Sequence, residues 1–209
     1  MTTLVSSLLS AGCSVVGYRG QTETPNYTVI DCVDDVEIRH YEPRLAAETV
    51  VNESSVEKAR EVGFKRLAGY IFGDNEPNRK IDMTAPVAQT STTIDMTAPV
   101  AQNATSDGWL IQFFLPRDWS IETAPQPTDE RIELAPIAAE NYAVLRFSNS
   151  RSESAVESHT ERLRHELVAS VWRPTGQAIA WFYDPPWTLP FLRRNEVALP
   201  VERVTTSAD

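Results

Sequence analysis

The sequence predicts an α+β protein built on a largely antiparallel sheet that carries two amphipathic helices. Several short segments alternate apolar and polar residues, as half-buried strands do, and turn residues separate them. Two longer stretches repeat apolar residues at helical spacing, each beginning at a Ser-x-x-Glu capping box. The order strands, helix, strands occurs twice. The turns between neighbouring strands are too short to form the crossovers of a parallel sheet, so the sheet is predicted to be largely antiparallel. The 209 residues fit one domain of about 180 residues and a leader.

Three strand candidates open the first half. Residues 27–30 are β-prone, residues 36–41 alternate, and residues 45–51 follow a proline turn, so we expect the last two segments to form a hairpin. The alternation predicts two faces, one with Val36, Ile38 and His40 and one with Glu37, Arg39 and Tyr41. His40 therefore lies on the apolar face.

The first helix is predicted from Ser54 to Gly73. Ser54 and Glu57 form the capping box, and Gly73 is the C-terminal stop. The apolar stripe consists of Val56, Ala59, Gly63, Leu67 and Tyr70. Arg60 lies one residue from this stripe.

A nine-residue repeat follows this helix. Residues 81–89 (IDMTAPVAQ) return unchanged as residues 94–102, a period of thirteen residues. This period is too short for a solenoid or a propeller, so we interpret the repeat as a local duplication. Apolar alternation predicts one short strand in each copy, ending near Pro86 and Pro99, with a loop at residues 90–93 between them.

The second half repeats the pattern of the first. Strands are predicted at residues 109–115, 132–134, 142–147 and 178–183, and a proline-rich loop at residues 123–129. A helix is predicted from the capping box of Ser154 and Glu157 to a stop before Pro174. Its stripe consists of Val156, Thr160, Leu163, Leu167 and Val171.

Composition and motifs limit the function classes. The net charge is −10 and no run of Lys or Arg occurs, so nucleic acid is excluded as a partner. No apolar run reaches the ~20 residues of a transmembrane span. The sequence has no G-x-S-x-G, H-E-x-x-H, P-loop or G-x-G-x-x-G motif, and its three histidines lack metal-ligand spacing. A monomeric binding protein is therefore favoured over an enzyme.

The first 26 residues form a separate leader. Small residues before Cys13, after a short apolar run, are similar to a lipoprotein cleavage site, and residues 14–26 would then be a tether. This predicts lipidation at Cys13 and attachment to the cell envelope. Because no Lys or Arg precedes the apolar run, an unmodified cytoplasmic N-terminus and a misassigned start site are the alternatives. Cys32, the other cysteine, is expected to be a buried small apolar residue.

Four segments together resemble the SOUL haem-binding family. They are V-E-I-R-H-Y at 36–41, the helix with Ala59-Arg60 and Gly63-Phe64, M-T-A-P-V at 83–87, and Y-D-P-P-W at 183–187 continuing to R-R-N-E-V at 193–197. The resemblance covers about residues 27–202, and the doubled M-T-A-P-V is similar to the bacterial branch. It implies a twisted, barrel-like antiparallel sheet with two helices and an internal pseudo-two-fold repeat, here at residues 27–203, before a flexible tail at 204–209.

The function that this resemblance implies is non-covalent binding of haem or a related tetrapyrrole, for buffering, transport or sensing. Such a site needs an apolar platform, a cation for the propionates and optionally an iron ligand. His40 occupies the position of a proposed axial histidine, and its alternative role is a hydrogen bond within the sheet. Arg60 matches a helix arginine that would pair with a propionate, and its alternative is a solvated arginine.

The remaining site residues follow from the same motifs. Gly63 belongs to the helix motif, and Trp187 to the loop where relatives carry a basic residue that is Thr188 here. Met83, like Met96, is a candidate weak iron ligand or a core residue. Two other function classes stay open: a module that binds apolar small molecules without haem, and an enzyme acting on tetrapyrroles.

Overall fold

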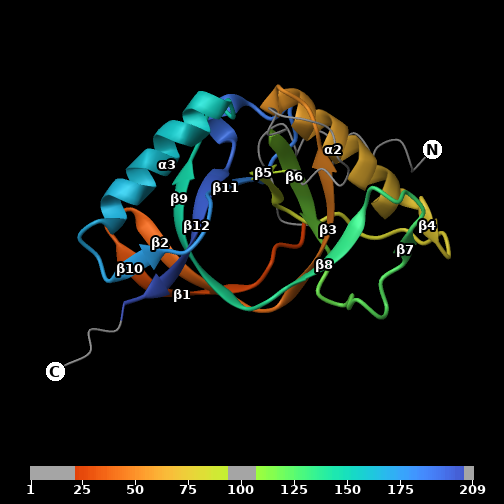
Figure 1. Ribbon diagram of the computed structural model, residues 1–209, viewed down its shortest axis with the longest axis horizontal. Coiled ribbons are helices and arrows are strands. Elements are labelled where there is room, and N and C mark those ends of the chain that lie inside the picture. Colours follow the sequence, from red (N-terminus) through yellow and green to blue (C-terminus); the bar gives the residue numbers. More distant parts are fainter. Residues whose placement is uncertain (1–21, 94–106, 205–209) are drawn as a thin grey trace, which may run out of the picture.

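The computed structural model describes residues 22–93 and 107–204, which form an open, twisted antiparallel sheet with two helices on one side (Figure 1). The helices are α2 (Val56–Phe72), α3 (Glu153–Leu167) and the 3₁₀ turn η1 (Pro190–Leu192). The strands are β1 (Tyr27–Val33), β2 (Val36–Tyr41), β3 (Arg44–Val51), β4 (Asn75–Glu76), β5 (Val87–Thr93), β6 (Asp107–Phe114), β7 (Gln126–Pro127), β8 (Glu133–Ile137), β9 (Glu140–Phe147), β10 (Trp172–Pro174), β11 (Ile179–Phe182) and β12 (Asn195–Arg203).

The sheet consists of two similar halves that meet between β11 and β5. Its strand order is β1-β2-β9-β12-β11-β5-β6-β3-β8, with β10 beside the end of β12. In one half the chain runs from β9 through α3 to β11 and β12, and in the other from β3 through α2 to β5 and β6. The predicted fold class and the pseudo-two-fold repeat are thus confirmed, although β1 and β8 remain as edges and the sheet does not close into a barrel.

Each half has its own core, and a third core lies at the seam. Helix α2 packs on β3 and β6, and α3 packs on β9 and β12, each through an apolar cluster on the outer face of the sheet. The third cluster lies on the concave inner face and contains Tyr41, Phe114, Tyr142, Trp181 and Tyr183. Both faces of the central strands are therefore buried.

The predicted hairpin of residues 36–41 and 45–51 is wrong. Strand β2 pairs with β1 and β9, while β3 pairs with β6 and β8. Because both edges of β2 are already occupied, the short link at residues 42–43 instead carries the chain from one half to the other.

The strand predicted in the first copy of the repeat is displaced. Residues 81–86 are irregular, and β5 begins at Val87, so Pro86 precedes the strand instead of ending it. The expected loop at residues 90–93 is the second half of β5, where β-branched threonines pair with β6. The second copy lies outside the described residues.

Both helices begin at a different serine from the one predicted. The N-caps are Ser55, which accepts from the amide of Lys58 at 3.3 Å, and Ser152, which accepts from the amide of Ala155 at 3.3 Å. The α2 stripe is buried as predicted and ends at Gly73, with φ 126°. The α3 stripe ends at Leu167, so Val171 lies beyond the helix and is exposed.

The structure differs from two expectations about the N-terminal part of the chain. The expectation that Cys32 is buried is wrong: Cys32 is exposed on β1, an edge strand that pairs on one side only within the described residues. Residues 22–26, assigned above to the tether, lie against the folded body, where the carbonyl of Glu23 accepts from the amide of Ala85 at 2.9 Å. Cys13 lies outside the described residues.

Gly63 sets the distance between α2 and the sheet. A Cβ added at Gly63 would lie 2.5 Å from Cγ1 and 2.8 Å from Cβ of Ile111, a fully buried β6 residue. We expect Gly63→Ala to lower the free energy of unfolding by about 1–3 kcal/mol, because helix and strand must separate. Urea denaturation measures this.

Gly69→Ala is the matched control on the same helix. Its Cβ would meet Oδ2 of Asp74 at 2.7 Å, the far end of a side chain that can move away. Ala also has the higher helix propensity, so this variant should be neutral or slightly more stable. Equal losses in both variants would contradict the packing role of Gly63.

Candidate functional site

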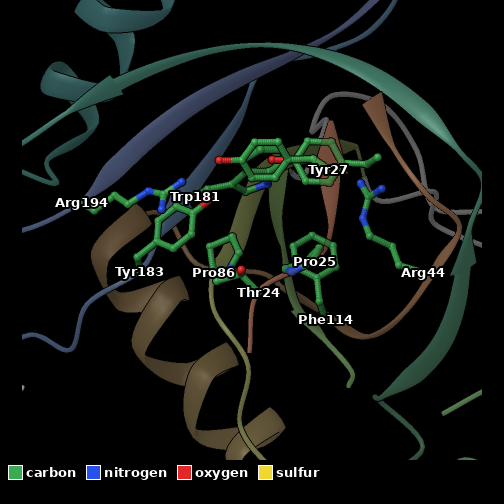
Figure 2. Close-up of a pocket in the computed structure, with 10 residues that line it drawn as sticks. Thr24, Pro25, Tyr27, Arg44, Pro86, Phe114, Trp181, Tyr183 and Arg194 are labelled. Carbon is green, nitrogen blue, oxygen red and sulfur yellow. The ribbon is translucent and has the colours of Figure 1, made fainter. Parts of the chain in front are cut away.

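Aromatic rings and arginines surround a small cavity on the concave face of the sheet. It lies at the seam of the two halves, and Figure 2 shows its side chains converging from the strands of both. The lining residues are Thr24, Pro25, Tyr27, Tyr41, Arg44, Pro86, Phe114, Trp181, Tyr183 and Arg194. Tyr41, Tyr142 and Trp181 contact one another with ring centroids 5.3–5.7 Å apart. The cavity itself measures about 10 Å³, room for a single water-sized group.

A buried ion cluster lies beside the cavity. Glu196 is fully buried and accepts from Arg39 at 2.9 and 3.2 Å and from Arg194 at 2.7 and 2.9 Å. The hydroxyl of Tyr183 also donates to Glu196 at 2.7 Å. Arg39 is 3% exposed and donates in addition to Glu37 at 2.7 Å. The carboxylate thus has two cations and a phenol around it, as a buried charge requires.

The pKa values of this cluster keep it charged at neutral pH. Burial alone would raise the pKa of Glu196, but the hydrogen bonds from Arg39 and the charges of Arg39 and Arg194 outweigh it and hold that pKa below its usual value. Burial raises the pKa of Tyr41 to about 12 and that of Tyr183 well above its usual value. Both phenols therefore stay protonated and able to donate.

Arg60 of α2 lies on the opposite, outer face of the sheet, over the ring of Phe182. Its guanidinium stacks 4.2 Å from the ring of Phe182, and its Nε donates to Oε1 of Gln89 at 2.7 Å. Its Nη2 donates to the carbonyl of Arg151 at 3.3 Å. Burial and then the positive charge of Arg151 lower the pKa of Arg60 to about 10. Two arginines are therefore held close together by hydrogen bonds to neutral oxygens, and the charges of Glu57 and Asp184 act on them from nearby.

The Trp187 loop adjoins these arginines. Arg151 Nη1 donates to the carbonyl of Asp184 at 3.2 Å, and Arg193 donates to the carbonyls of Pro186 and Thr188 at 2.9 and 2.8 Å. The arginines thus fix the backbone of residues 184–193. Three apolar side chains of this loop are solvent-exposed: Trp187 (64%), Leu189 (41%) and Phe191 (66%). We call Arg60, Arg151 and these three side chains the outer patch.

His40 is far from the outer patch. It pairs with Asn141 on β9, and its Nδ1 lies 2.8 Å from the Oδ1 of Asn141. Phe182, beneath Arg60, pairs with Asn195, which pairs with Phe147 on β9. Asn141 and Phe147 are six residues apart, about 20 Å along a strand. Alternation also turns His40 away from the cavity that the adjacent Tyr41 lines.

The other two predicted site residues also lie apart. Gly63 is buried between α2 and Ile111, where it allows close packing. Met83 is 39% exposed in the irregular segment before β5, whose Ile81 bonds to Ile71 at the C-terminal end of α2. The structure therefore links Arg60 to the Trp187 loop through Arg151 and leaves His40, Gly63 and Met83 elsewhere. The ligand-binding roles of all five residues stay predictions.

The sequence analysis missed the concave cavity. It placed Arg39 and Tyr41 on the more polar face of their strand, yet both are buried on the concave face. One available signal was Glu196 at the start of the apolar run Val197-Ala198-Leu199, which is typical of a strand buried on both faces. A charged residue in such a strand needs a buried partner of opposite charge.

The described residues form a small α+β domain with a cavity on its concave face and an exposed apolar loop on its outer face. Residues 22–200 match the sequence profile of the family described as SOUL heme-binding protein, and the chain belongs to this family. It is 28% identical over 186 residues to Heme-binding protein 2 of Mus musculus, covering 85% of each chain. It is 27% identical over 161 residues to Heme-binding protein 1 of Xenopus tropicalis, covering 77% of this chain and 80% of that one.

Solved structures with little sequence similarity share the fold. The EcmrR C-terminal domain has a TM-score of 0.58 at 10% identity, covering 85% of this chain and 99% of that one. An uncharacterized conserved protein from Listeria innocua has a TM-score of 0.54 at 9% identity, covering 88% and 95%. At such identities the likeness establishes the fold alone.

The Glu196 cluster generates a prediction about stability. Glu196→Gln leaves Arg39 and Arg194 without their carboxylate, so we expect the free energy of unfolding at pH 7 to fall by about 3–5 kcal/mol. Because the folded pKa of Glu196 is lowered, its stabilisation is complete above the ordinary carboxyl pKa of about 4.5 and is lost as pH falls through the folded value. Urea denaturation between pH 7 and pH 3 measures both effects.

Glu202→Gln is the control, because Glu202 is an exposed residue of the same strand. The gap between wild type and Glu196→Gln should narrow as the pH falls below 4.5, while Glu202→Gln follows wild type throughout. A gap that is absent at pH 7, or that stays constant down to pH 3, would show that the ion cluster does not stabilise the fold.

Proposed function

We propose that the protein binds haem or a related tetrapyrrole non-covalently and acts as a carrier, buffer or sensor rather than as an enzyme. Family membership supports this, as do the names of its relatives, which are heme-binding proteins in frog and mouse. The doubled M-T-A-P-V segment further supports placement in the bacterial branch of the family.

The outer patch fits the chemistry of this ligand. Haem presents a flat apolar face and two propionates, so its site needs an exposed apolar platform beside cations. Trp187, Leu189 and Phe191 provide exposed apolar surface, and Arg60 and Arg151 lie at the base of their loop. The observation that carries the proposal is this exposed aromatic loop fixed to an arginine pair whose hydrogen bonds go to neutral oxygens.

The chain's own residues would bind and orient the macrocycle. Bound haem would supply an iron centre and a strongly absorbing ring. The stacking contact with Phe182 holds the guanidinium of Arg60 in place. A propionate would pair with this guanidinium in a charge-assisted hydrogen bond. Desolvation of the arginine, which lowers its pKa, makes pairing with an anion more favourable.

Haemin titration tests the proposal. The Soret band of haemin should shift and saturate near one equivalent of the full chain, with an affinity near micromolar, about −8 kcal/mol. Arg60→Ala and Trp187→Ala should each weaken binding about tenfold, or ~1.4 kcal/mol, through loss of a propionate partner and of apolar contact. Arg164→Ala, at an exposed arginine of α3, is the control and should bind as wild type does.

His40→Ala separates the two predicted haem positions. Haem bound at the outer patch would lie about 20 Å from His40 along the sheet, so His40→Ala should leave the haem spectrum unchanged. Loss of a low-spin spectrum in His40→Ala, with Arg60→Ala unaffected, would place haem at His40 and refute the outer patch. A Soret change that never saturates, and that equals the change seen with an unrelated acidic protein, would refute haem binding. It would favour a module that binds other apolar ligands.

We also propose that Cys13 is lipidated and attaches the protein to the cell envelope. The small residues before Cys13 and the apolar stretch support this. Within residues 22–93 and 107–204, no helix is long and apolar enough to cross a membrane. Several acyl chains on Cys13 would give stable attachment, whereas one chain gives only marginal binding.

Detergent phase partitioning tests this attachment. The chain expressed with its natural upstream region should enter the detergent phase and yield an acylated Cys13 peptide by mass spectrometry. Cys13→Ser should move to the aqueous phase, and Cys32→Ser, at the other cysteine, should not. An unmodified Cys13 peptide, still joined to Met1 or Thr2 in the soluble fraction, would refute lipidation and favour a cytoplasmic protein.

A further inference from the structure

Two side chains of the concave cavity have buried nitrogens without a hydrogen-bond partner in the described part of the chain. They are Nε and Nη1 of Arg44, and Nε1 of Trp181. Trp181 is 2% exposed, and both side chains line the same cavity (Figure 2). All three nitrogens can only donate. A buried unpaired donor costs about 1–3 kcal/mol, so an acceptor in the cavity, either a water or a ligand oxygen, is favoured.

Arg44 also carries a charge that lies mainly against aromatic rings. Its guanidinium lies 5.0, 5.1 and 5.5 Å from the ring centres of Tyr41, Phe114 and Tyr142, a cage of aromatic faces. Its Nη2 donates to the hydroxyl of Tyr142 at 3.4 Å, a weak bond, and that hydroxyl donates in turn to Glu140, so this carboxylate reaches Arg44 only through the phenol. The second cation of the cavity, Arg194, is instead satisfied by Glu196. An acceptor that also bears negative charge therefore suits Arg44 best.

The cavity adjoins a groove of about 350 Å³, a volume within the range of small-molecule sites. Thr24, Pro25 and Arg44 line both spaces, so they form the boundary between them. The apolar lining of the groove comes from Leu45, Leu115, Trp119, Ile121, Pro136 and Ile137. An acceptor at Arg44 could thus be joined to an apolar body in the groove.

The other charges of the groove are engaged or point into solvent. Glu23 accepts from the amide and Nε of Arg117 at 3.1 and 3.3 Å. Glu122 accepts from the hydroxyl of Ser120 at 2.6 Å, and the side chain of Glu42 is 72% exposed. Arg44 is therefore the charge that distinguishes one end of the groove from the other.

We propose that the concave face binds a small organic acid, whose carboxylate contacts Arg44 and Trp181 and whose apolar body lies in the adjoining groove. This site is separate from the outer patch, which lies on the opposite face of the sheet. Residues 23–26 form one wall of the groove, held by the ion pair of Glu23 with Arg117 and by Asn26, which accepts from Arg117 at 3.3 Å. Movement of this wall would widen the 10 Å³ cavity for the carboxylate.

Three probes with one apolar body test the charge preference in the full wild-type chain. They are 1-naphthoate, 1-naphthalenemethanol and 1-naphthylmethylammonium, and calorimetry measures their binding. We expect 1-naphthoate to bind at one equivalent and at least tenfold more tightly than the alcohol, with the ammonium weakest. The indole N–H signal of Trp181, assigned with Trp181→Phe, should shift in ¹H–¹⁵N spectra as 1-naphthoate saturates. Equal binding of the three probes, or an unmoved Trp181 signal, would overturn the proposal and leave a water-sized cavity.

Arg44 variants test the named contact. Arg44→Met keeps the length of the side chain and should weaken 1-naphthoate at least tenfold while leaving the alcohol unchanged, and Arg44→Lys should recover part of the loss. Arg164→Met is the control on α3. Wild-type affinity in Arg44→Met would overturn the proposal, and the probe comparison above decides the matter if this variant does not fold.

The test is independent of haem. Saturating 1-naphthoate should leave the haemin titration unchanged, because the two sites lie on opposite faces of the sheet. Absence of any Soret shift would end the haem proposal and leave the 1-naphthoate result standing. Displacement of 1-naphthoate by one equivalent of haemin, with loss of the Soret shift in Arg44→Met, would place haem in the groove and overturn the inference of a second site.

Discussion

The buried carboxylate of Glu196 is the constraint on which the concave face depends. Its bond from Arg39 joins β2 to β12 across β9, its bond from Arg194 comes from the residue before β12, and its bond from Tyr183 reaches the end of β11. Removing one partner of a buried ion pair costs far more than an exposed pair contributes, so these four side chains behave as a unit. The sheet thereby contains a charged cluster, although both faces of its central strands are buried.

The two-fold arrangement of the halves explains why the candidate sites are on opposite faces. Each half covers its outer face with one helix, and the outer patch occupies the region where α2 and the loop after β11 approach each other. Within the described part of the chain no helix covers the concave face, and aromatic rings and paired charges fill it. Phe182 and Trp181 show this division, because adjacent residues of β11 support Arg60 outside and line the cavity inside.

The sequence predicted the features that depend on local patterns. The α2 stripe, the Gly73 stop and the bounds of β2 follow from spacing within a few residues, and the structure confirms them. Strand pairing was missed where it depends on distant partners, as with β2 and β9 or Arg39 and Glu196, which are 157 residues apart. The chemistry of Arg44 was equally hidden, because a lone arginine after a proline is usually solvated and only the fold surrounds it with three rings.

The placement of charge offers a reason for selectivity in an acidic protein. The chain carries a net charge of −10, which repels anions at long range, whereas an anion at one of the two proposed sites would be attracted at short range by Arg44 or by Arg60 and Arg151. Salt screens the first effect beyond about 8–10 Å but acts far less on partly buried contacts. An anion therefore gains affinity only if its apolar body brings the acid group within contact distance of an arginine. This requirement favours amphipathic acids, including tetrapyrroles with propionates, over simple inorganic anions.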